Sequence, residues 1–359
     1  MKIATIVGAR PQFIKAAPVS KALLEQGGIE EVVIHTGQHY DHAMSALFFE
    51  QLGMRPPNVQ LNINGGRHGD MTGRMLQAIE PILVEREPDV VLVYGDTNST
   101  LAGALAASKL NIPVAHVEAG LRSFDRRMPE EVNRVLTDHL SDVLFAPTDK
   151  AVENLKSEGV GERDQKIVRT GDVMLDASLM CRPYAKPPPE MASNREGFVL
   201  ATIHRAENTD DSDRLKGAFA GLARIHREVA PVVLPLHPRT EGALKRDGIE
   251  PEVEVIDPTG FAEMVWLLQR AAVVVTDSGG VQKEAYFFGK PCITVRDTTE
   301  WTELVEAKVN ELVGPEADEM LDAVTRHFGG DVSPADGLYG DGSAALAIAT
   351  ELQRRFSAQ

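Results

Sequence analysis

The feature that most constrains the fold is an alternation of short strands and amphipathic segments along the whole chain. Runs rich in β-branched residues recur, and segments such as Thr72–Glu85, Ser99–Lys109 and Asp213–Val229 between them carry helical spacing. This alternation predicts parallel sheets that are covered by helices on both faces. The expected strands are Lys2–Val7, Val32–Thr36, Val90–Tyr94, Pro113–Val117, Val143–Ala146, Phe198–Ile203, Val232–Leu236, Val253–Ile256, Val273–Thr276 and Cys292–Arg296.

The length and one proline-rich segment predict two domains. The chain has 359 residues, more than twice the commonest domain size. Arg182–Gly197 contains Pro183 and three consecutive prolines, so it is the segment most typical of a linker. It divides the expected strands into five and five. We therefore predict an α/β protein of two doubly wound domains, and the helix expected over Gly342–Phe356 could belong to either.

Composition excludes several classes of protein. There are 37 Lys and Arg against 53 Asp and Glu, and the formal charge of −16 argues against a general nucleic-acid binder. No apolar run approaches the roughly 18 residues of a membrane span, and the first apolar run is too short for a secretory leader. Cys181 and Cys292 cannot make a disulfide framework, so we expect a cytoplasmic protein without a membrane segment.

Polar residues follow six of the expected strands, at the edge where open parallel sheets bind ligands. Gly8–Lys15 is a glycine turn that leads into a helix, and Arg10 and Lys15 lie in its first turns. A helix N-terminus with two cations suits a phosphate. The alternative is an ordinary turn with solvated cations. Neither a G-x-G-x-x-G motif after the first strand nor a P-loop motif is present.

A second phosphate candidate lies in the other half of the chain. Ser278, Gly279 and Gly280 begin a helix after a strand, and the glycines would let a diphosphate approach the backbone. Glu284, one helical turn further on, is placed to reach the two hydroxyls of a ribose. The alternative is a plain Ser N-cap with close packing of helix on sheet.

Asp96, Glu118 and Glu130 form a set of carboxylates in the first half. Asp96 and Glu118 leave strands that should be neighbours, so their side chains would converge. Repulsion between like charges would then raise at least one pKa and provide an acid and a base in one site. The structural alternatives are an N-cap for Asp96, an ion pair of Glu118 with Arg122, and a surface pair of Glu130 with Arg134.

Other histidines and charged runs receive structural interpretations. His35, His39 and His42 lack the acidic ligands that would complete a site, so we expect no metal. His116 lies inside a strand and is expected to be a hydrogen-bonded core residue. The charge-rich stretch Glu303–Glu311 is interpreted as a solvated face.

The motifs, taken in order, resemble those of the non-hydrolysing UDP-N-acetylglucosamine 2-epimerases over practically the whole chain. They are GARPQFIKAAP, GDTNST, HVEAGLRS, PEEVNR, TIHRAEN, TDSGGVQKEA and RDTTE. The resemblance implies the GT-B architecture, with two Rossmann-like domains and the active site in the cleft between them. It implies domains over residues 1–170 and 171–341, with the closing segment 342–359 returning to the N-terminal domain.

The resemblance also implies a reaction, the reversible epimerisation at C2 of UDP-N-acetylglucosamine to UDP-N-acetylmannosamine without a cofactor. A base removes the C2 proton while UDP leaves C1, and UDP then adds back to 2-acetamidoglucal as C2 is protonated on the opposite face. The catalytic residues that it implies are Asp96, Glu118, Glu130 and His204. The substrate-binding residues that it implies are Arg10, Lys15, Asp96, Glu118, His204, Thr259, Met264, Ser278, Gly279, Gly280 and Glu284.

The chain departs from the family pattern at the nucleotide site. Trp301 follows RDTTE where an Arg is usual, and Thr259 and Met264 replace the usual Gln and Phe of the uracil loop. The Trp301 variant is similar to relatives that act on UDP-2,3-diacetamido-glucuronic acid, which is therefore the main alternative substrate. A hydrolysing epimerase and a GT-B glycosyltransferase are further alternatives, although a transferase has no evident need for three carboxylates.

Many family members bind a second UDP-N-acetylglucosamine as an activator. Gln38, Arg205 and His237 match that allosteric site, whereas His68 and Ala206 replace a usual Gln and Arg. These replacements argue against activation by substrate. The partner that the resemblance implies is a UDP-sugar, and it further implies a homodimer and a role in polysaccharide biosynthesis.

Overall fold

The computed structural model describes residues 1–38, 54–162, 164–330, 332 and 337–357. They form two compact units: unit 1 is Met1–Met180 with Gly337–Gln359, and unit 2 is Cys181–Asp336. The division lies ten residues beyond the boundary expected at residue 170, because most of helix α7 (Val173–Cys181) belongs to unit 1. Among the described residues, every helix is too short or too polar to serve as a membrane span.

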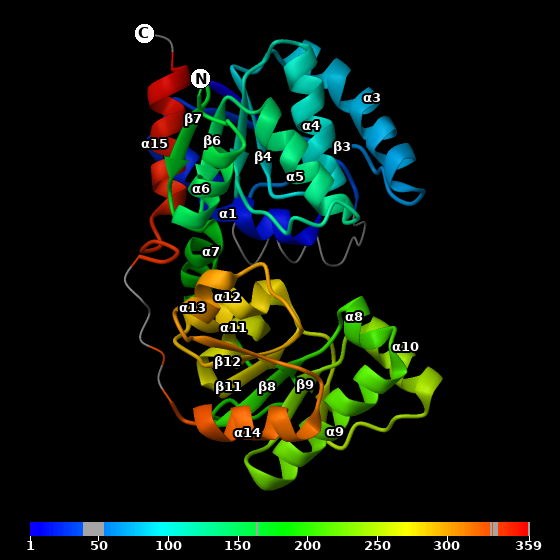
Figure 1. Cartoon of the computed structure of the whole chain (residues 1–359). Helices are drawn as coiled ribbons and strands as arrows, with labels where there is room; N and C mark the ends of the chain where they lie inside the picture. Colours follow the sequence, from blue (N-terminus) through cyan, green and yellow to red (C-terminus); the bar gives the residue numbers. More distant parts are fainter. Residues whose placement is uncertain (39–53, 163, 331, 333–336, 358–359) are drawn as a thin grey trace. The chain divides into compact units, whose positions relative to one another are not determined.

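Unit 1 is built on a seven-stranded sheet in the order β3-β2-β1-β4-β5-β6-β7, and every recorded pairing is parallel (Figure 1). The chain order reverses at β1, which lies between β2 and β4. Ligands bind doubly wound sheets at such a switch point. The strands are β1 Lys2–Val7, β2 Glu30–His35, β3 Val59–Gln60, β4 Val90–Tyr94, β5 Val114–Val117, β6 Val143–Ala146 and β7 Lys166–Arg169.

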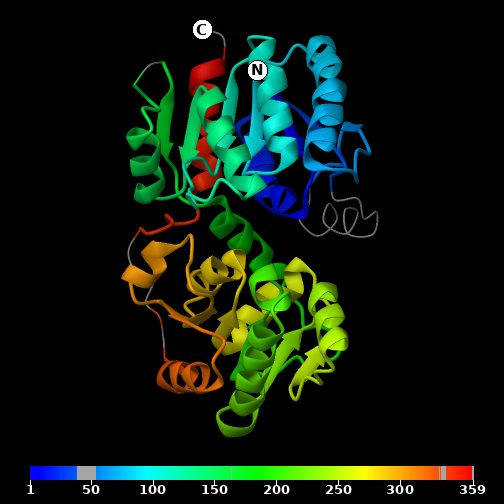
Figure 2. The ribbon, with the colours of Figure 1, turned by 45° about the vertical axis from the view of Figure 1, so that its right-hand side comes forward.

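Helices pack in succession against the sheet of unit 1. Helix α4 (Asn98–Lys109) contacts both α3 (His68–Arg86) and α5 (Pro129–Leu140) (Figure 2). Helix α3 buries Met75, Ile79 and Leu83 at helical spacing against strand residues. The closing helix α15 (Ala344–Phe356) packs on α1 (Arg10–Gln26), and this contact makes it part of unit 1 (Figure 1). Helix α6 spans Asp149–Ser157.

Unit 2 contains a six-stranded parallel sheet in the order β10-β9-β8-β11-β12-β13, with the reversal at β8. The strands are β8 Phe198–Thr202, β9 Val232–Pro235, β10 Glu254–Ile256, β11 Ala271–Thr276, β12 Cys292–Val295 and β13 Asn310–Val313. The helices are the 3-10 helix η1 Arg182–Tyr184, α8 Ala206–Thr209, α9 Ser212–Glu228, α10 Pro238–Asp247, α11 Phe261–Arg270, α12 Gly279–Phe287, α13 Thr302–Glu306 and α14 Ala317–His327.

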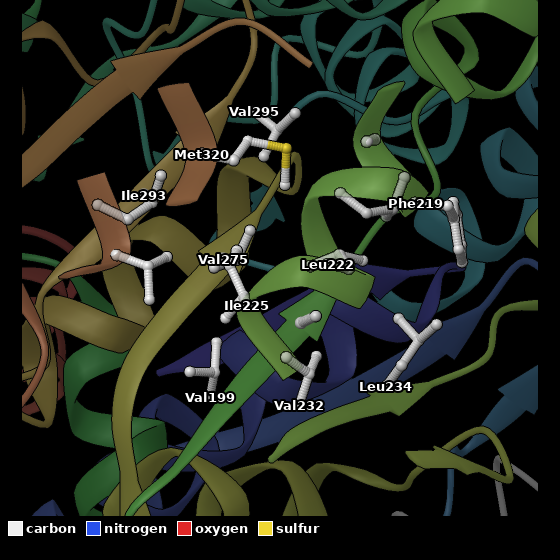
Figure 3. Close-up of a cluster of buried hydrophobic side chains, with 14 of the residues drawn as sticks. Val199, Phe219, Leu222, Ile225, Val232, Leu234, Val275, Ile293, Val295 and Met320 are labelled. Carbon is white, nitrogen blue, oxygen red and sulfur yellow. The ribbon is translucent and has the colours of Figure 1, made fainter. Parts of the chain in front are cut away.

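The core of unit 2 joins helices α9 and α14 to one face of the sheet. Figure 3 shows Leu222 of α9 and Met320 of α14 packed with Val199, Val275 and Ile293 of the strands. These β-branched strand residues present the flat apolar surface that an amphipathic helix needs. The alternation in the sequence therefore led to the right fold class, two Rossmann-like units with parallel sheets.

Three strands were missed by the sequence interpretation, β3, β7 and β13, and each lies at an edge of its sheet. An edge strand pairs on one side only, so it does not need a continuous apolar run. β3 has two residues, and both ends of β7 are exposed. The interpretation of Glu303–Glu311 as a solvated face was wrong in part, because Leu304 and Val309 are buried and Asn310 begins β13.

Two helical glycines of unit 2 form a matched test of the packing around α9. A Cβ added at Gly217 of α9 would lie 2.5 Å from the carbonyl oxygen of Pro315, whereas one added at Gly242 of α10 would meet nothing within 4 Å. Gly242→Ala should raise the free energy of unfolding by about 0.5–1 kcal/mol. Gly217→Ala should lower it by about 1–3 kcal/mol through overpacking. Urea unfolding followed by circular dichroism measures both, and shifts of the same sign would contradict the contact.

Candidate functional site

Strands β4 and β5 bring two candidate carboxylates to one edge of the unit 1 sheet. The strands pair in parallel with Tyr94 opposite Val117, so the residues that follow them leave at the same edge, as predicted. Glu118 forms an ion pair with the ammonium group of Lys15 on α1, and both side chains are largely buried. The pair places the positive charge of Lys15 next to the carboxylate of Glu118, the residue that follows β5.

Glu118 has a left-handed backbone conformation, with φ of 71°. A residue with a Cβ adopts this region rarely, and a strained conformation of this kind costs on the order of 1 kcal/mol or more. Gly120, two residues later, also has a positive φ, and a Cβ there would collide with the backbone of Ala151. The turn after β5 is therefore fixed by packing, and it aims the carboxylate of Glu118.

Asp96, at the end of β4, has a different environment. Its carboxylate lies 2.6 Å from the guanidinium of Arg134 on α5, and about a third of the side chain is exposed (33%). Burial raises the pKa of the Asp96 carboxyl above its usual value, although the charge of Arg134 opposes this. The negative charges of Glu118 and Glu130 raise the pKa further. Asp96 and Glu118 are thus two carboxylates with different surroundings, which is the condition for separate acid and base roles.

The three structural alternatives for these carboxylates were wrong. Thr97, and not Asp96, is the N-cap of α4. Arg122 donates to Asp138 and Glu158, while Glu118 has the Lys15 partner described above.

In the PEEVNR motif, the side chains that reach the sheet edge carrying Asp96 and Glu118 are not the ones that the sequence suggested. The Arg134 side chain pairs with Asp96, while its Nε donates to the main-chain oxygen of Glu130 and lies 3.5 Å from Oε2 of Glu131. The amide of Asn133 donates to the carbonyl oxygen of Asp96 at 3.0 Å. Glu130 itself is exposed, whereas Glu131 is buried and accepts bonds from Ser123. The partner residues Asn133 and Arg134 were missed, because helical spacing alone made Arg134 a local partner of Glu130.

The start of α1 differs from the expected phosphate cradle. The backbone N–H groups of Gly8 and Ala9 donate to Oε1 of Gln12 at 2.8 and 3.0 Å. The Gln12 amide in turn donates to the carbonyl oxygen of Tyr94 and the hydroxyl of Thr100. Gln12 therefore occupies donors that a phosphate would use and ties the first turn to the end of β4. Arg10 is half-buried at the same turn.

Helix α12 of unit 2 begins at the Ser278-Gly279-Gly280 motif. Ser278 is the N-cap, but its side chain makes no capping hydrogen bond. A Cβ at Gly280 would meet only the Ser278 hydroxyl, at 4.0 Å, so the backbone there is open to a ligand. Ser278 thus has the N-cap position of the structural alternative but does not make the capping hydrogen bond. Glu284 is buried one turn further along the helix.

His204 follows β8, the strand that pairs with β11. Its backbone N–H donates to Asp277, a fully buried carboxylate that also accepts bonds from the N–H of Arg205 and the amide of Asn208. Burial lowers the pKa of His204, although Asp277 acts in the opposite direction. Burial therefore favours the neutral form of the imidazole. It lies 5.3 Å from the ring of His237, measured between centroids.

The residues at the positions that depart from the family pattern lie near α11 and α12. Glu300 approaches Gly279 and accepts from Arg205 at 3.4 Å, and Arg205 is one of the residues assigned to the activator site. The ring of Trp301 lies 4.2 Å from the ammonium nitrogen of the buried Lys283. Thr259 precedes the N-cap of α11, and Met264 of that helix packs against the core.

The other residues assigned to the activator site have local hydrogen-bond partners. Gln38 accepts from the hydroxyl of Ser99 at 2.8 Å, and Nδ1 of His68 lies 3.2 Å from the amide of Asn98. His237 is the N-cap of α10, where its Nδ1 accepts from a backbone N–H.

Among the described residues there is no group of three or more His, Cys, Asp or Glu that could hold a metal ion. His35 is buried and stacks on Phe13, with 4.8 Å between ring centroids. His39 and His42 lie outside the described residues.

Two parallel-sheet α/β units with charged and glycine-rich turns after their strands define the GT-B class. Comparison with solved structures agrees with this class. The crystal structure of the Methanocaldococcus jannaschii UDP-GlcNAc 2-epimerase in complex with UDP-GlcNAc and UDP matches with a TM-score of 0.87 and 42% identity, over 99% of this chain and 100% of that chain.

Sequence comparisons agree with the structural match. A family model for UDP-N-acetylglucosamine 2-epimerase matches residues 21–353. The UDP-2,3-diacetamido-2,3-dideoxy-D-glucuronate 2-epimerase of Pseudomonas aeruginosa is 57% identical, over 99% of this chain and 100% of the relative. The UDP-N-acetylglucosamine 2-epimerase of Escherichia coli K12 is 38% identical, over 98% of each. The chain therefore belongs to the UDP-N-acetylglucosamine 2-epimerase family and is an isomerase of nucleotide sugars, as the motifs predicted.

Glu118→Gln tests the carboxylate site. The amide keeps the size of the side chain but cannot act as a base, so turnover should fall by at least about 100-fold. The affinity for UDP, measured by calorimetry, should stay within a few-fold. Glu153→Gln is the control, because Glu153 is 70% exposed on α6. Turnover of Glu118→Gln equal to that of the control would remove Glu118 from the mechanism.

Ser278→Ala tests the start of α12. A hydroxyl that donates to a charged phosphate contributes about 1.5–3 kcal/mol, so the Kd for UDP should rise about tenfold or more. Ser157→Ala serves as the control, since Ser157 of α6 donates only to the carbonyl oxygen of Asn154 within the same helix. An unaltered UDP affinity in Ser278→Ala would exclude the phosphate assignment.

Proposed function

We propose that this protein inverts C2 of a UDP-2-acetamido sugar by eliminating and re-adding UDP. The observation that supports the proposal most is the pair of unlike carboxylates at the ends of β4 and β5. Asp96 has a raised pKa, and Glu118 faces the ammonium of Lys15. A reaction that moves one proton off a carbon and returns it on the other face requires two such groups.

The reaction that we propose has two steps, an elimination and a re-addition. A carboxylate takes the C2 proton, the electron pair of the C–H bond forms the C1=C2 double bond, and the C1–O bond breaks with its electrons passing to the β-phosphate of UDP. A second group then protonates C2 from the opposite face while the phosphate oxygen adds to C1. We assign Glu118 to the base and Asp96 to the acid in one direction, with the roles reversed in the other. Glu130, whose charge acts on Asp96, is assigned to the sugar.

The groups assigned to the nucleotide are those of unit 2. Ser278, Gly279 and Gly280 would hold the diphosphate and Glu284 the ribose, with Thr259 and Met264 near the base. A neutral His204 can donate one hydrogen bond to the departing diphosphate. Because the ring is uncharged, it needs no carboxylate beside it to balance a positive charge. Arg10 and Lys15 remain predicted phosphate contacts.

The sugar that the comparisons favour is a UDP-2,3-diacetamido-glucuronic acid. The Pseudomonas relative that acts on this sugar has a higher identity to the chain than the E. coli enzyme, over nearly the full length of both. Trp301 in place of the usual Arg supports the same substrate. UDP-N-acetylglucosamine, the substrate predicted first from the motifs, is the second candidate, and the family model supports it. The homodimer, the cytoplasmic location and the role in polysaccharide biosynthesis stay predictions.

Proton NMR in D2O tests the reaction and the sugar together. The protein is incubated with UDP-2,3-diacetamido-glucuronic acid and, separately, with UDP-N-acetylglucosamine, without added cofactor. Deuterium at C2 together with the C2-inverted UDP-sugar is expected, and faster with the first sugar. Exchange only with UDP-N-acetylglucosamine would overturn the sugar assignment. Release of a free sugar would indicate a hydrolysing epimerase, and no exchange with either sugar would contradict the proposed reaction.

A further inference from the structure

His116 of β5 is fully buried beneath the two carboxylate turns and is hydrogen-bonded through both ring nitrogens. Nδ1 lies 2.7 Å from Oδ1 of Asp138, and Nε2 lies 2.8 Å from the carbonyl oxygen of Gly95. The expectation of a satisfied core histidine is thus confirmed. The partners also bear on the protonation of the ring, because a carboxylate oxygen and a carbonyl oxygen are both hydrogen-bond acceptors.

A neutral imidazole carries one N–H and can donate to only one of these partners. The other nitrogen would then face an oxygen lone pair in a buried site, which is costly. A doubly protonated imidazolium satisfies both contacts. It also balances the buried charges, since Arg122 bridges Asp138 and Glu158 at 2.7 Å each, and two cations then face two carboxylates.

The same contacts reach both catalytic turns. Gly95, whose carbonyl accepts from His116, directly precedes Asp96, and its N–H donates to the carbonyl oxygen of Val117, the residue before Glu118. Asp138 accepts from the N–H of Gly120, two residues after Glu118, at 3.1 Å. His116 and Asp138 therefore connect the turn after β4 to the turn after β5 through hydrogen bonds to Gly95 and Gly120.

We propose that His116 is a positioning residue, a buried imidazolium that fixes the turns carrying Asp96 and Glu118 relative to each other. Its catalytic consequence rests on the proposed function. Its charge state does not, because we infer it from the two hydrogen-bond partners of the ring. Losing the bond to Gly95 would let the Asp96 turn move, and a misplacement of about 1 Å can cost on the order of 100-fold in rate.

The charge state is tested in the unmodified protein by NMR. Histidine labelled with ¹⁵N is incorporated into the full chain, and long-range ¹H–¹⁵N correlations are recorded at about pH 8, where an unperturbed imidazole is neutral. One ring with both nitrogens protonated is expected, and its signals should vanish in His116→Asn. A singly protonated His116 ring would overturn the proposal, whatever the enzyme does with any sugar.

The positioning role is tested by kinetics with the UDP-sugar that the wild type epimerises. His116→Asn is neutral, and its amide reaches toward Asp138 but not Gly95. It should lower kcat about 100-fold while leaving KM and UDP affinity within about threefold. The control is His139→Asn, the next residue to Asp138 on α5, whose side chain is 48% exposed, and it should match the wild type. A folded His116→Asn protein with unchanged kcat, or with only KM raised, would overturn the role. If His116→Asn does not fold, the neutral variant His116→Gln is measured in its place, both for the kinetics and for the assignment of the NMR signals.

Discussion

The pairing of buried charges at the ends of β4 and β5 is the constraint on which the rest of unit 1 depends. Removing the cation from a buried carboxylate leaves an uncompensated charge that costs several kcal/mol. Glu118 has Lys15 from α1, Asp96 has Arg134 from α5, and Asp138 has Arg122 beside it. Burial would raise the pKa of Asp138, yet its partners hold that pKa below the usual value. Each pair holds a helix or a turn against the sheet. The positions of α1 and α5 are therefore tied to the carboxylates that their cations neutralise.

The sequence predicted the parts of the fold that depend on local pattern. Interior strands must be apolar on both faces, so their runs were visible, and neighbouring strands carried Asp96 and Glu118 to one edge. Edge strands such as β7, with polar ends, carry no such signal. Charge partners were missed for a different reason. Arg134 satisfies a local rule with Glu130, and only the docking of α5 on the sheet turns it toward Asp96.

The sheets of the two units reverse their strand order at β1 and at β8, and the backbone groups near these two points differ in whether they are already hydrogen-bonded. At β1, Gln12 closes the backbone donors of the turn with its own side chain, which makes that turn a rigid support. At β8, Asp277 gathers the N–H groups that follow the strand, while the start of α12 stays open around Gly280. Motif patterns identified the start of α1 and the start of α12 as phosphate candidates, because a sequence shows where glycines and cations lie but not which donors are already occupied.

The left-handed backbone at Glu118 has a consequence for how this enzyme would respond to selection. Glycine and asparagine adopt φ near 71° with less strain than glutamate. Replacing the residue by either would relieve the backbone but would leave the largely buried ammonium of Lys15 without its carboxylate partner. A library screened only for heat resistance would therefore set the relief of backbone strain against the loss of this ion pair. A glutamate in this backbone conformation is an example of local strain of the kind that is concentrated at functional sites.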